Sequence, residues 1–220
     1  MKKLEVARLV EQVDMTPGKT YEEMKRFCED AITKKIASVC VLPIHVPSVV
    51  NTLRGTGVKV CALISFPLGM DTKEVKFAET SEAIGEGAAE IEMVINVGAA
   101  KGGDKKTIDE ELKGVVEESH KNHCLLKAII EMPLLDQGQA VNAACWAGEA
   151  GADFVVTSTG YAGLKLRVTT VEDVKLLRHV LAPSVAIKAA VGIQNMEIVL
   201  AMIEAGAGRV GVSSVSKLLV

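Results

Sequence analysis

Short apolar runs alternate with amphipathic segments along the whole chain. The runs are rich in valine, isoleucine and alanine, which is typical of parallel strands that are covered on both faces. Between them, apolar residues recur at helical spacing, and "TYEE" from Thr20 and "DTKE" from Asp71 fit the pattern of a helix capping box. Strands are predicted at Val13–Met15, Ala37–Leu42, Val58–Ser65, Leu125–Met132 and Val185–Ala189.

One junction between a helix and a strand occurs three times. It reads "EGAAEIEMVINVG" from Glu86, "EAGADFVVTSTG" from Glu149 and "EAGAGRVGVSS" from Glu204. In each copy an amphipathic helix ends at a glycine, which adopts a left-handed C-cap without a Cβ penalty, and an apolar strand follows directly. The repetition indicates a fold built from strand–helix units.

Together these segments predict eight strands, each followed by a helix, within the usual length of a (β/α)8 or TIM barrel. The N-terminal stretch "MKKLEVARLVEQVD" alternates charged and apolar residues at helical spacing, so a short helix is expected before the barrel. The alternative is an open doubly wound sheet, which carries a glycine fingerprint after its first strand, and "VDMTPGKT" does not provide one. We therefore expect residues 1–220 to form a single barrel domain.

The composition of the chain argues against several classes of protein, namely those that bind nucleic acid, span a membrane or depend on disulfides. Hydrophobic residues make up 49% of the chain and aromatic residues only 3%, which predicts a large and mainly aliphatic core. A formal net charge of -3 gives no general attraction to nucleic acid or acidic membranes, and no segment approaches the roughly 20 apolar residues of a membrane span. The five cysteines are scattered among apolar neighbours, which favours free thiols in a reducing compartment. These features predict a cytoplasmic protein without a nucleic-acid or membrane partner.

The carboxyl ends of the strands are where (β/α)8 barrels bind their ligands. In this sequence they are rich in Gly, Ser, Thr and Asn, which suits loops that approach a small ligand closely. Gly192 follows the seventh strand, and Gly211, Ser213 and Ser214 precede a short helix predicted at Ser214–Leu219. Backbone N–H groups there could bind a phosphate. Ordinary loop glycines and an N-capping serine are the simpler alternative.

Charged residues inside the predicted strands are candidates for catalytic residues. Strand side chains alternate between two faces of the strand. If the faces that carry the charged residues and the cysteine point into the barrel, four side chains converge near its top: Lys127, Lys188, Glu92 and Cys40. One interpretation is a buried structural ion pair between Lys127 and Glu92. The other is that the two lysines repel each other, so that one has a lowered pKa. That lysine would be a neutral amine able to form an imine with a carbonyl, while a carboxylate moves the protons.

Seven separated motifs, in order over essentially the whole chain, together resemble the deoxyribose-phosphate aldolase family. They are "CVLP", "SFPLG", "EIEMVINVG", "LLKAIIEM", "GADFVVTSTG", "IKAAVGI" and "RVGVSS". "VDMT" is similar to that family's opening motif, with Asp14 and Thr16 in its polar positions. The resemblance implies a (β/α)8 barrel that reversibly joins acetaldehyde to glyceraldehyde 3-phosphate through a lysine imine and needs no metal.

The resemblance also implies an imine-forming lysine directly before "TSTG", where this sequence has Val156. The family's proton-moving aspartate corresponds to Glu92, and the loop after the sixth strand has become "YAGLKLRV". Further departures are Leu42 for an asparagine, Val191 for a glycine and Gln194 for an arginine. Matches remain at Cys40, Lys127, Lys188, Gly211, Ser213 and Ser214.

Three functions remain open. In the first, an aldolase acts on 2-deoxyribose 5-phosphate or another small phosphorylated sugar or aldehyde, with Lys188 forming the imine while Glu92 and Lys127 relay protons. In the second, Glu92 is the base of a different enzyme and a lysine stabilises charge. In the third, a non-catalytic homologue binds a phosphorylated metabolite or a protein partner. The expected substrate-binding residues are Asp14, Thr16, Cys40, Ser158, Gly160, Gly192, Gly211, Ser213 and Ser214.

Other polar residues are given simpler explanations. His120 and His123 are three residues apart but have no third ligand in sequence, so a solvated helix end is favoured, and no metal or other cofactor is predicted. Lys165 and Arg167 lie in the altered loop after the sixth strand, where exposed loop charges are favoured over phosphate contacts. A homo-oligomer is compatible with each function.

Overall fold

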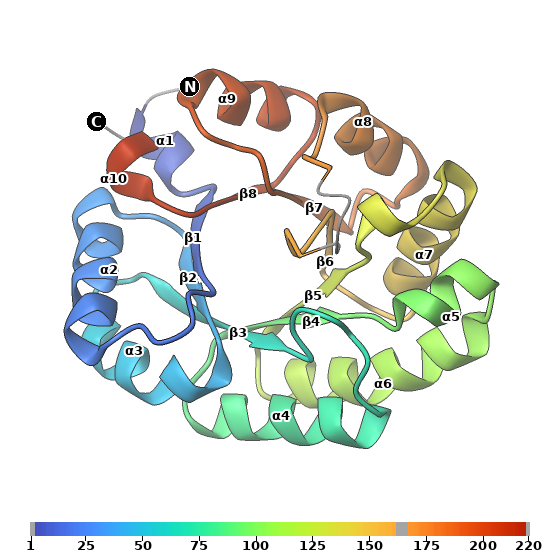
Figure 1. The fold of residues 1–220 in the computed structure, drawn as a ribbon, viewed down its shortest axis with the longest axis horizontal. Coiled ribbons are helices and arrows are strands. Elements are labelled where there is room, and N and C mark those ends of the chain that lie inside the picture. The colour runs from blue at the N-terminus through green and yellow to red at the C-terminus, as the bar shows by residue number, and fades with distance from the viewer. Residues whose placement is uncertain (1–2, 162–166, 219–220) are drawn as a thin grey trace.

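The computed structural model describes residues 3–161 and 167–218, in which eight parallel strands close into a barrel in chain order (Figure 1). The strands are β1 Val10–Asp14, β2 Ser38–Val41, β3 Lys59–Ile64, β4 Glu90–Val94, β5 Leu125–Ile129, β6 Phe154–Val156, β7 Ala186–Ala190 and β8 Arg209–Val212. The ring closes where β1 pairs with β8, with Glu11 opposite Gly211. The predicted (β/α)8 barrel is therefore confirmed.

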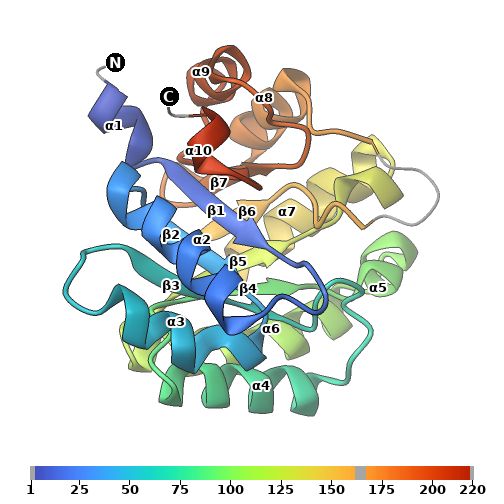
Figure 2. The same ribbon diagram turned by 60° about the vertical axis from the view of Figure 1, so that its left-hand side comes forward.

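Helices cover the outside of the strand ring. The longer ones are α2 Tyr21–Lys34, α3 Val46–Leu53, α4 Lys73–Gly85, α6 Lys105–Lys121, α7 Gln137–Glu149, α8 Val171–Val180 and α9 Met196–Glu204. Short segments are α1 Lys3–Ala7, α5 Val97–Gly102, α10 Val215–Leu218 and the 3-10 turns η1 Pro43–His45 and η2 Met132–Leu134. Figure 2 shows α8 and α9 across the barrel from α4 and α6, as Figure 1 does. None of the described helices combines the length and apolar character that a bilayer crossing requires.

The first strand begins earlier than predicted. Helical spacing suggested a helix through most of the N-terminal stretch and a strand at Val13–Met15, but α1 ends at Ala7 and β1 starts at Val10. Pairing with β8 accounts for the difference, because Val10 and Glu11 lie opposite Val210 and Gly211 in the closed ring. Tertiary pairing thus overrides a local helical pattern, and it carries Glu11 into the barrel.

The barrel has two apolar regions of unequal size. A large core of aliphatic side chains lies between the strands and the helices. A small separate cluster contains the buried Cys40, Cys61 and Leu63, which come from the adjacent strands β2 and β3. All five cysteines carry free thiols, as expected. The rest of the interior accommodates charged side chains.

Gly69, between β3 and α4, is expected to tolerate no side chain. Its φ is +65°, and an added Cβ would overlap the carbonyl oxygen of Ile95. Gly103 has a similar φ of +76° but nothing within 4 Å of its Cβ position. Gly69→Ala should therefore lose about 1–3 kcal/mol more unfolding free energy than Gly103→Ala, because both share the backbone strain but only Gly69 clashes. Urea unfolding of both variants measures this difference, and equal losses would contradict it.

Candidate active site

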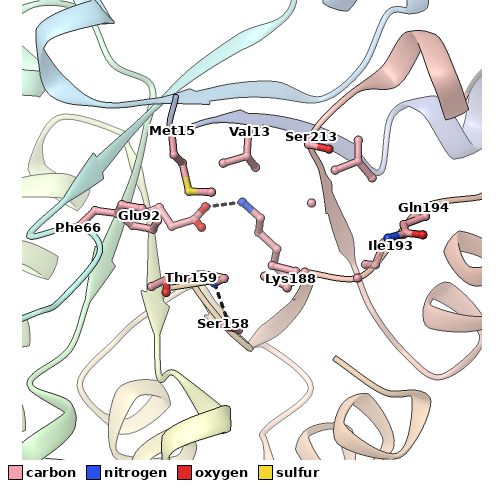
Figure 3. A pocket seen from close by; sticks show the side chains of 16 residues that line it. Val13, Met15, Phe66, Glu92, Ser158, Thr159, Lys188, Ile193, Gln194 and Ser213 are labelled. Carbon is pink, nitrogen blue, oxygen red and sulfur yellow. Dashed lines mark hydrogen bonds and ion pairs between the residues drawn. The ribbon is translucent and has the colours of Figure 1, made fainter. Parts of the chain in front are cut away.

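A cavity of about 290 Å³ opens at the carboxyl ends of the strands (Figure 3). Its lining comes from β1, β4, β7 and β8 and from the loops that follow β1, β3, β6, β7 and β8. Lys188 and Glu92 are the charged side chains among the described residues that line it. This is the end of the barrel at which the sequence predicted the site.

Lys188 and Glu92 form a close ion pair at the cavity. Lys188 Nζ lies 2.5 Å from Glu92 Oε2, and the dashed line in Figure 3 joins these two atoms. The lysine comes from β7 and the glutamate from β4, so the pair spans the inside of the ring. Both side chains are almost fully buried. The structure thus brings together two of the three residues that were predicted to be catalytic.

Lys127, the third predicted catalytic residue, contacts the same network without lining the cavity. Within the described part of the chain it is absent from the lining, and its side chain is 1% exposed. Its Nζ lies 2.6 Å from Glu11 Oε1 and 2.6 Å from Glu90 Oε2, but 3.9 Å from Glu92 Oε2. Glu11 and Glu90 are therefore closer partners of Lys127 than the predicted Glu92.

Glu11 is the residue that sequence reasoning missed. It is fully buried, and its Oε2 lies 2.6 Å from Lys188 Nζ while its Oε1 lies 3.2 Å from Arg209 Nε. We call the six charged residues of this network the interior charge cluster: Glu11, Glu90, Glu92, Lys127, Lys188 and Arg209. The available signal was the position of Glu11 three residues before Asp14, on a segment that was assigned to a helix.

The electrostatics of the interior charge cluster differ from the prediction. Burial alone would lower the pKa of Lys188, but Cys40, Glu11 and Glu92 outweigh burial and raise that pKa well above the usual lysine value. The pKa of Lys127 is likewise raised, because the carboxylates of Glu11 and Glu90 outweigh burial. The prediction that repulsion leaves one lysine neutral is therefore wrong for the unliganded protein. Three carboxylates lie among the amines, and each lysine is held as an ammonium.

The expected substrate-binding residues fall into two groups. Those that line the cavity are Ser158, Gly160, Gly192, Gly211 and Ser213. Ser214 borders an adjoining hollow of about 340 Å³ that shares Ser213 with the cavity. Asp14, Thr16 and Cys40 are outside the described lining of both spaces. The first two bond locally, since Thr16 N–H donates to Asp14 Oδ1 over 2.9 Å and Lys19 pairs with Asp14. Cys40 lies in the interior, with its Sγ 3.5 Å from Lys188 Nζ.

Glu131, two residues after the end of β5, holds one wall of the cavity in place. Its carboxylate accepts hydrogen bonds from Ser158 Oγ over 2.7 Å and from the backbone N–H of Thr159 over 3.0 Å. The residue is 2% exposed and has a φ of +51°, a region that is uncommon for a side chain other than glycine or asparagine. These bonds fix the "TSTG" segment, including the Ser158 and Gly160 that line the cavity.

Two valines replace residues that the resemblance led us to expect. Val156 is fully buried and lies opposite Lys188 in the pairing of β6 with β7. Val191 lines the cavity with a φ of +77° and rests its side chain against Gly160. A β-branched residue in this conformation is strained. Both positions therefore present apolar groups beside the Lys188 region.

The altered loop after β6 is described only in part. Lys165 lies outside the described residues. Arg167 donates from its two terminal nitrogens to Asp173 on α8, over 2.6 Å and 3.0 Å. This guanidinium is half-exposed and is paired with a protein carboxylate, which agrees with the interpretation of a loop charge.

One group of possible ligand atoms does not make a metal site. The thiols of Cys40 and Cys61 and a Glu92 oxygen lie within 4.8 Å of one another. The Lys188 ammonium already lies 2.5 Å from that carboxylate and 3.5 Å from Cys40 Sγ, so a cation occupies the position next to them. Burial also raises the pKa of Cys61 well above its usual value and keeps its thiol protonated.

The fold and the cavity define a (β/α)8-barrel enzyme with an amine and a carboxylate in its pocket. A family model described as "DeoC/LacD family aldolase" matches residues 7–217. The chain belongs to this family of aldolases.

Known proteins support this assignment over the full length. The chain is 42% identical to the deoxyribose-phosphate aldolase of Clostridium tetani, covering 98% of both chains, and 42% identical to that of Thermococcus kodakarensis, covering 100% of this chain and 97% of the other. Among solved structures, the aldolase QR15 superposes with a TM-score of 0.91 at 35% identity, covering 98% of this chain and 94% of that one. A deoxyribose-phosphate aldolase from Aeropyrum pernix, described as tetrameric, superposes with a TM-score of 0.91 at 26% identity, covering 99% and 91%.

Proposed function

We propose that the protein is a deoxyribose-phosphate-aldolase-like carbon–carbon lyase in which Lys188 forms the imine with an aldehyde. The observation that carries this proposal is the 2.5 Å contact between Lys188 Nζ and Glu92 Oε2 at the cavity. Lys188 supplies an amine at the end of the barrel where related enzymes act, and Glu92 supplies a proton acceptor. The names of the relatives support a deoxyribose phosphate as substrate, and the family resemblance implies 2-deoxyribose 5-phosphate with acetaldehyde and glyceraldehyde 3-phosphate as products.

The ion pair provides a route to the neutral amine. When an aldehyde replaces water near the pair, transfer of one proton from Lys188 to Glu92 gives a neutral amine and a neutral carboxyl group. The amine adds to the carbonyl carbon, and the carbinolamine then takes the proton back as it loses water. The product is a protonated imine, which accepts the electron pair when the bond between the α and β carbons breaks, while the hydroxyl group on the β carbon gives up its proton and becomes the carbonyl of the released aldehyde.

The adjoining hollow suits the charged end of such a substrate. Gly192, Gly211 and Ser213 line the cavity, and Ser213 and Ser214 line the adjoining hollow. Hydroxyl and backbone N–H groups can bind a phosphate without a lysine or arginine. We also expect a homo-oligomer, because a similar structure is described as tetrameric, and a cytoplasmic location, because the five cysteines carry free thiols.

Trapping of the imine tests the proposed function. Incubation with acetaldehyde or 2-deoxyribose 5-phosphate, followed by borohydride, is expected to leave a reduced adduct on Lys188, which peptide mass spectrometry locates. Val156→Lys should add a second trapping site next to Lys188 and raise the yield. Turnover without an adduct would favour acid–base chemistry through Glu92. Thermal stabilisation by the sugar phosphate with neither adduct nor turnover would identify a binding protein and overturn the proposal.

A further inference from the structure

Glu11 contacts the proposed nucleophile but does not belong to the described lining of the cavity. Lys188 Nζ lies between two carboxylates, 2.5 Å from Glu92 Oε2 and 2.6 Å from Glu11 Oε2. Glu92 lines the cavity, whereas Glu11 is fully buried and lies outside the described lining. The two acids therefore have different access to a substrate, although they share the same ammonium.

Glu11 is also held more firmly than Glu92. Its Oε1 lies 2.6 Å from Lys127 Nζ and 3.2 Å from Arg209 Nε, while its Oε2 accepts a contact from Cys40 Sγ at 3.4 Å. Burial alone would raise the pKa of Glu11, but Lys127 and Lys188 outweigh burial and hold that pKa well below its usual range. Glu11 consequently stays ionised under conditions in which a carboxyl group that exchanges protons would not.

The charges of the interior charge cluster balance. Three buried carboxylates face two buried ammonium groups and the partly exposed guanidinium of Arg209. Imine formation conserves this balance, since Lys188–NH3+ and an aldehyde give Lys188–NH+=CHR and water, and the nitrogen is cationic before and after the reaction. A fixed anion next to this nitrogen therefore stabilises both the resting ammonium and the protonated imine.

We propose that Glu11 is the permanent counter-ion of Lys188, which keeps its nitrogen cationic at rest and in the protonated imine, while Glu92 alone exchanges the proton. This inference rests on the proposed function for the part that concerns the imine. The statement about the resting lysine is independent of any reaction. Glu11 is thus a positioning residue that acts on the substrate through Lys188.

Other charged or titratable groups around Lys188 must be separated from Glu11 in a test. They are Cys40 on β2, Cys61 on β3, Glu90 and Glu92 on β4, Lys127 on β5 and Arg209 on β8. Glu90 provides the matched control, because it is a buried strand carboxylate that pairs with Lys127 but has no described ion pair with Lys188. Glu11→Gln and Glu90→Gln each remove one negative charge from the interior charge cluster at nearly constant volume.

The experiment is a pH titration of Lys188 in the full chain. NMR of protein labelled with carbon-13 at the lysine ε position follows the lysine, and Lys188→Arg assigns its signal. Glu11→Gln is expected to move the titration of Lys188 to lower pH, and Glu90→Gln should move it clearly less. The rate of adduct trapping with acetaldehyde should rise at correspondingly lower pH in Glu11→Gln, because the neutral amine that attacks the aldehyde is then present at lower pH.

Several outcomes are decisive. The role of Glu11 would be overturned if the pKa of Lys188 in Glu11→Gln were the same as in the wild type or higher. It would also be overturned if Glu11→Gln and Glu90→Gln lowered the pKa of Lys188 equally. If Glu11→Gln does not fold, Glu11→Asp keeps the charge but withdraws it by one methylene, and the same direction of shift is required. A wild-type protein that forms no adduct would defeat the proposed function alone, because the titration still reports on Glu11.

Discussion

Replacement of Lys188 by methionine is expected to lower aldol cleavage at least about a thousandfold, because loss of a covalent nucleophile removes the intermediate through which the reaction runs. Methionine has a similar length but cannot form an imine, and because it also removes the positive charge beside Glu11 and Glu92, its effect is compared with that of Lys188→Arg, which keeps the charge. The reduced adduct on this residue should disappear as well. Steady-state release of an aldehyde from 2-deoxyribose 5-phosphate, measured with a coupled dehydrogenase, gives the rate.

Lys188→Arg is the matched variant for this result. A guanidinium keeps the positive charge opposite Glu92 and Glu11 but is not a nucleophile at neutral pH. If Lys188 forms the imine, arginine should be as inactive as methionine. Substantial turnover in Lys188→Arg would mean that the lysine acts only by its charge, and the second of the three functions would then be correct.

Glu111→Gln is expected to destabilise the protein by about 3–5 kcal/mol, because it leaves a buried ammonium without its partner. Lys76 on α4 is fully buried, and its Nζ lies 2.6 Å from Glu111 Oε2 on α6. Glutamine can still accept the backbone N–H of Asn96, which Glu111 Oε1 accepts over 2.6 Å, so the variant removes mainly the charge. In a protein of 220 residues this loss corresponds to roughly 6–20 °C in melting temperature, which differential scanning calorimetry measures.

The double variant Lys76→Met with Glu111→Gln controls for this effect. Burial raises the pKa of Glu111 in spite of the neighbouring Lys76, so the pair does not fully offset its own desolvation. Removal of both charges should therefore restore most of the stability that Glu111→Gln alone loses. A double variant as unstable as the single one would show that the charge pair is not the cause.

The barrel was predictable because its signals are local and repeated. Three copies of one helix–strand junction and a series of apolar runs are sufficient to count the strands, and the apolar run in the second copy is strand β6, Phe154–Val156. The first strand was placed too late because "LEVARLVEQV" satisfies helical spacing, whereas its strand conformation depends on pairing with residues about 200 positions away. Closure of the ring is a tertiary constraint that cannot be recognised in a short stretch of sequence.

The candidate site was predictable in its members but not in its electrostatics. The alternation of strand side chains correctly predicted that Lys188 and Glu92 lie together, because two oppositely charged side chains that point into the same narrow barrel interior are expected to pair. Their charge states depend on Glu11 and on the depth of Lys127, and neither follows from spacing along one strand. The wall held by Glu131 was missed for a related reason, because its bonds join two loops that follow different strands.

The matched charges inside the barrel also limit how this chain can diverge from its relatives. A substitution that changes the charge at one of the six positions leaves a buried partner without compensation, and the resulting protein is poorly stable. Single substitutions between apolar residues of similar volume are tolerated far better in the aliphatic core between the strands and the helices. Descendants of this chain are therefore expected to vary freely around the ring, while its polar centre changes by exchange of residues in complementary sets.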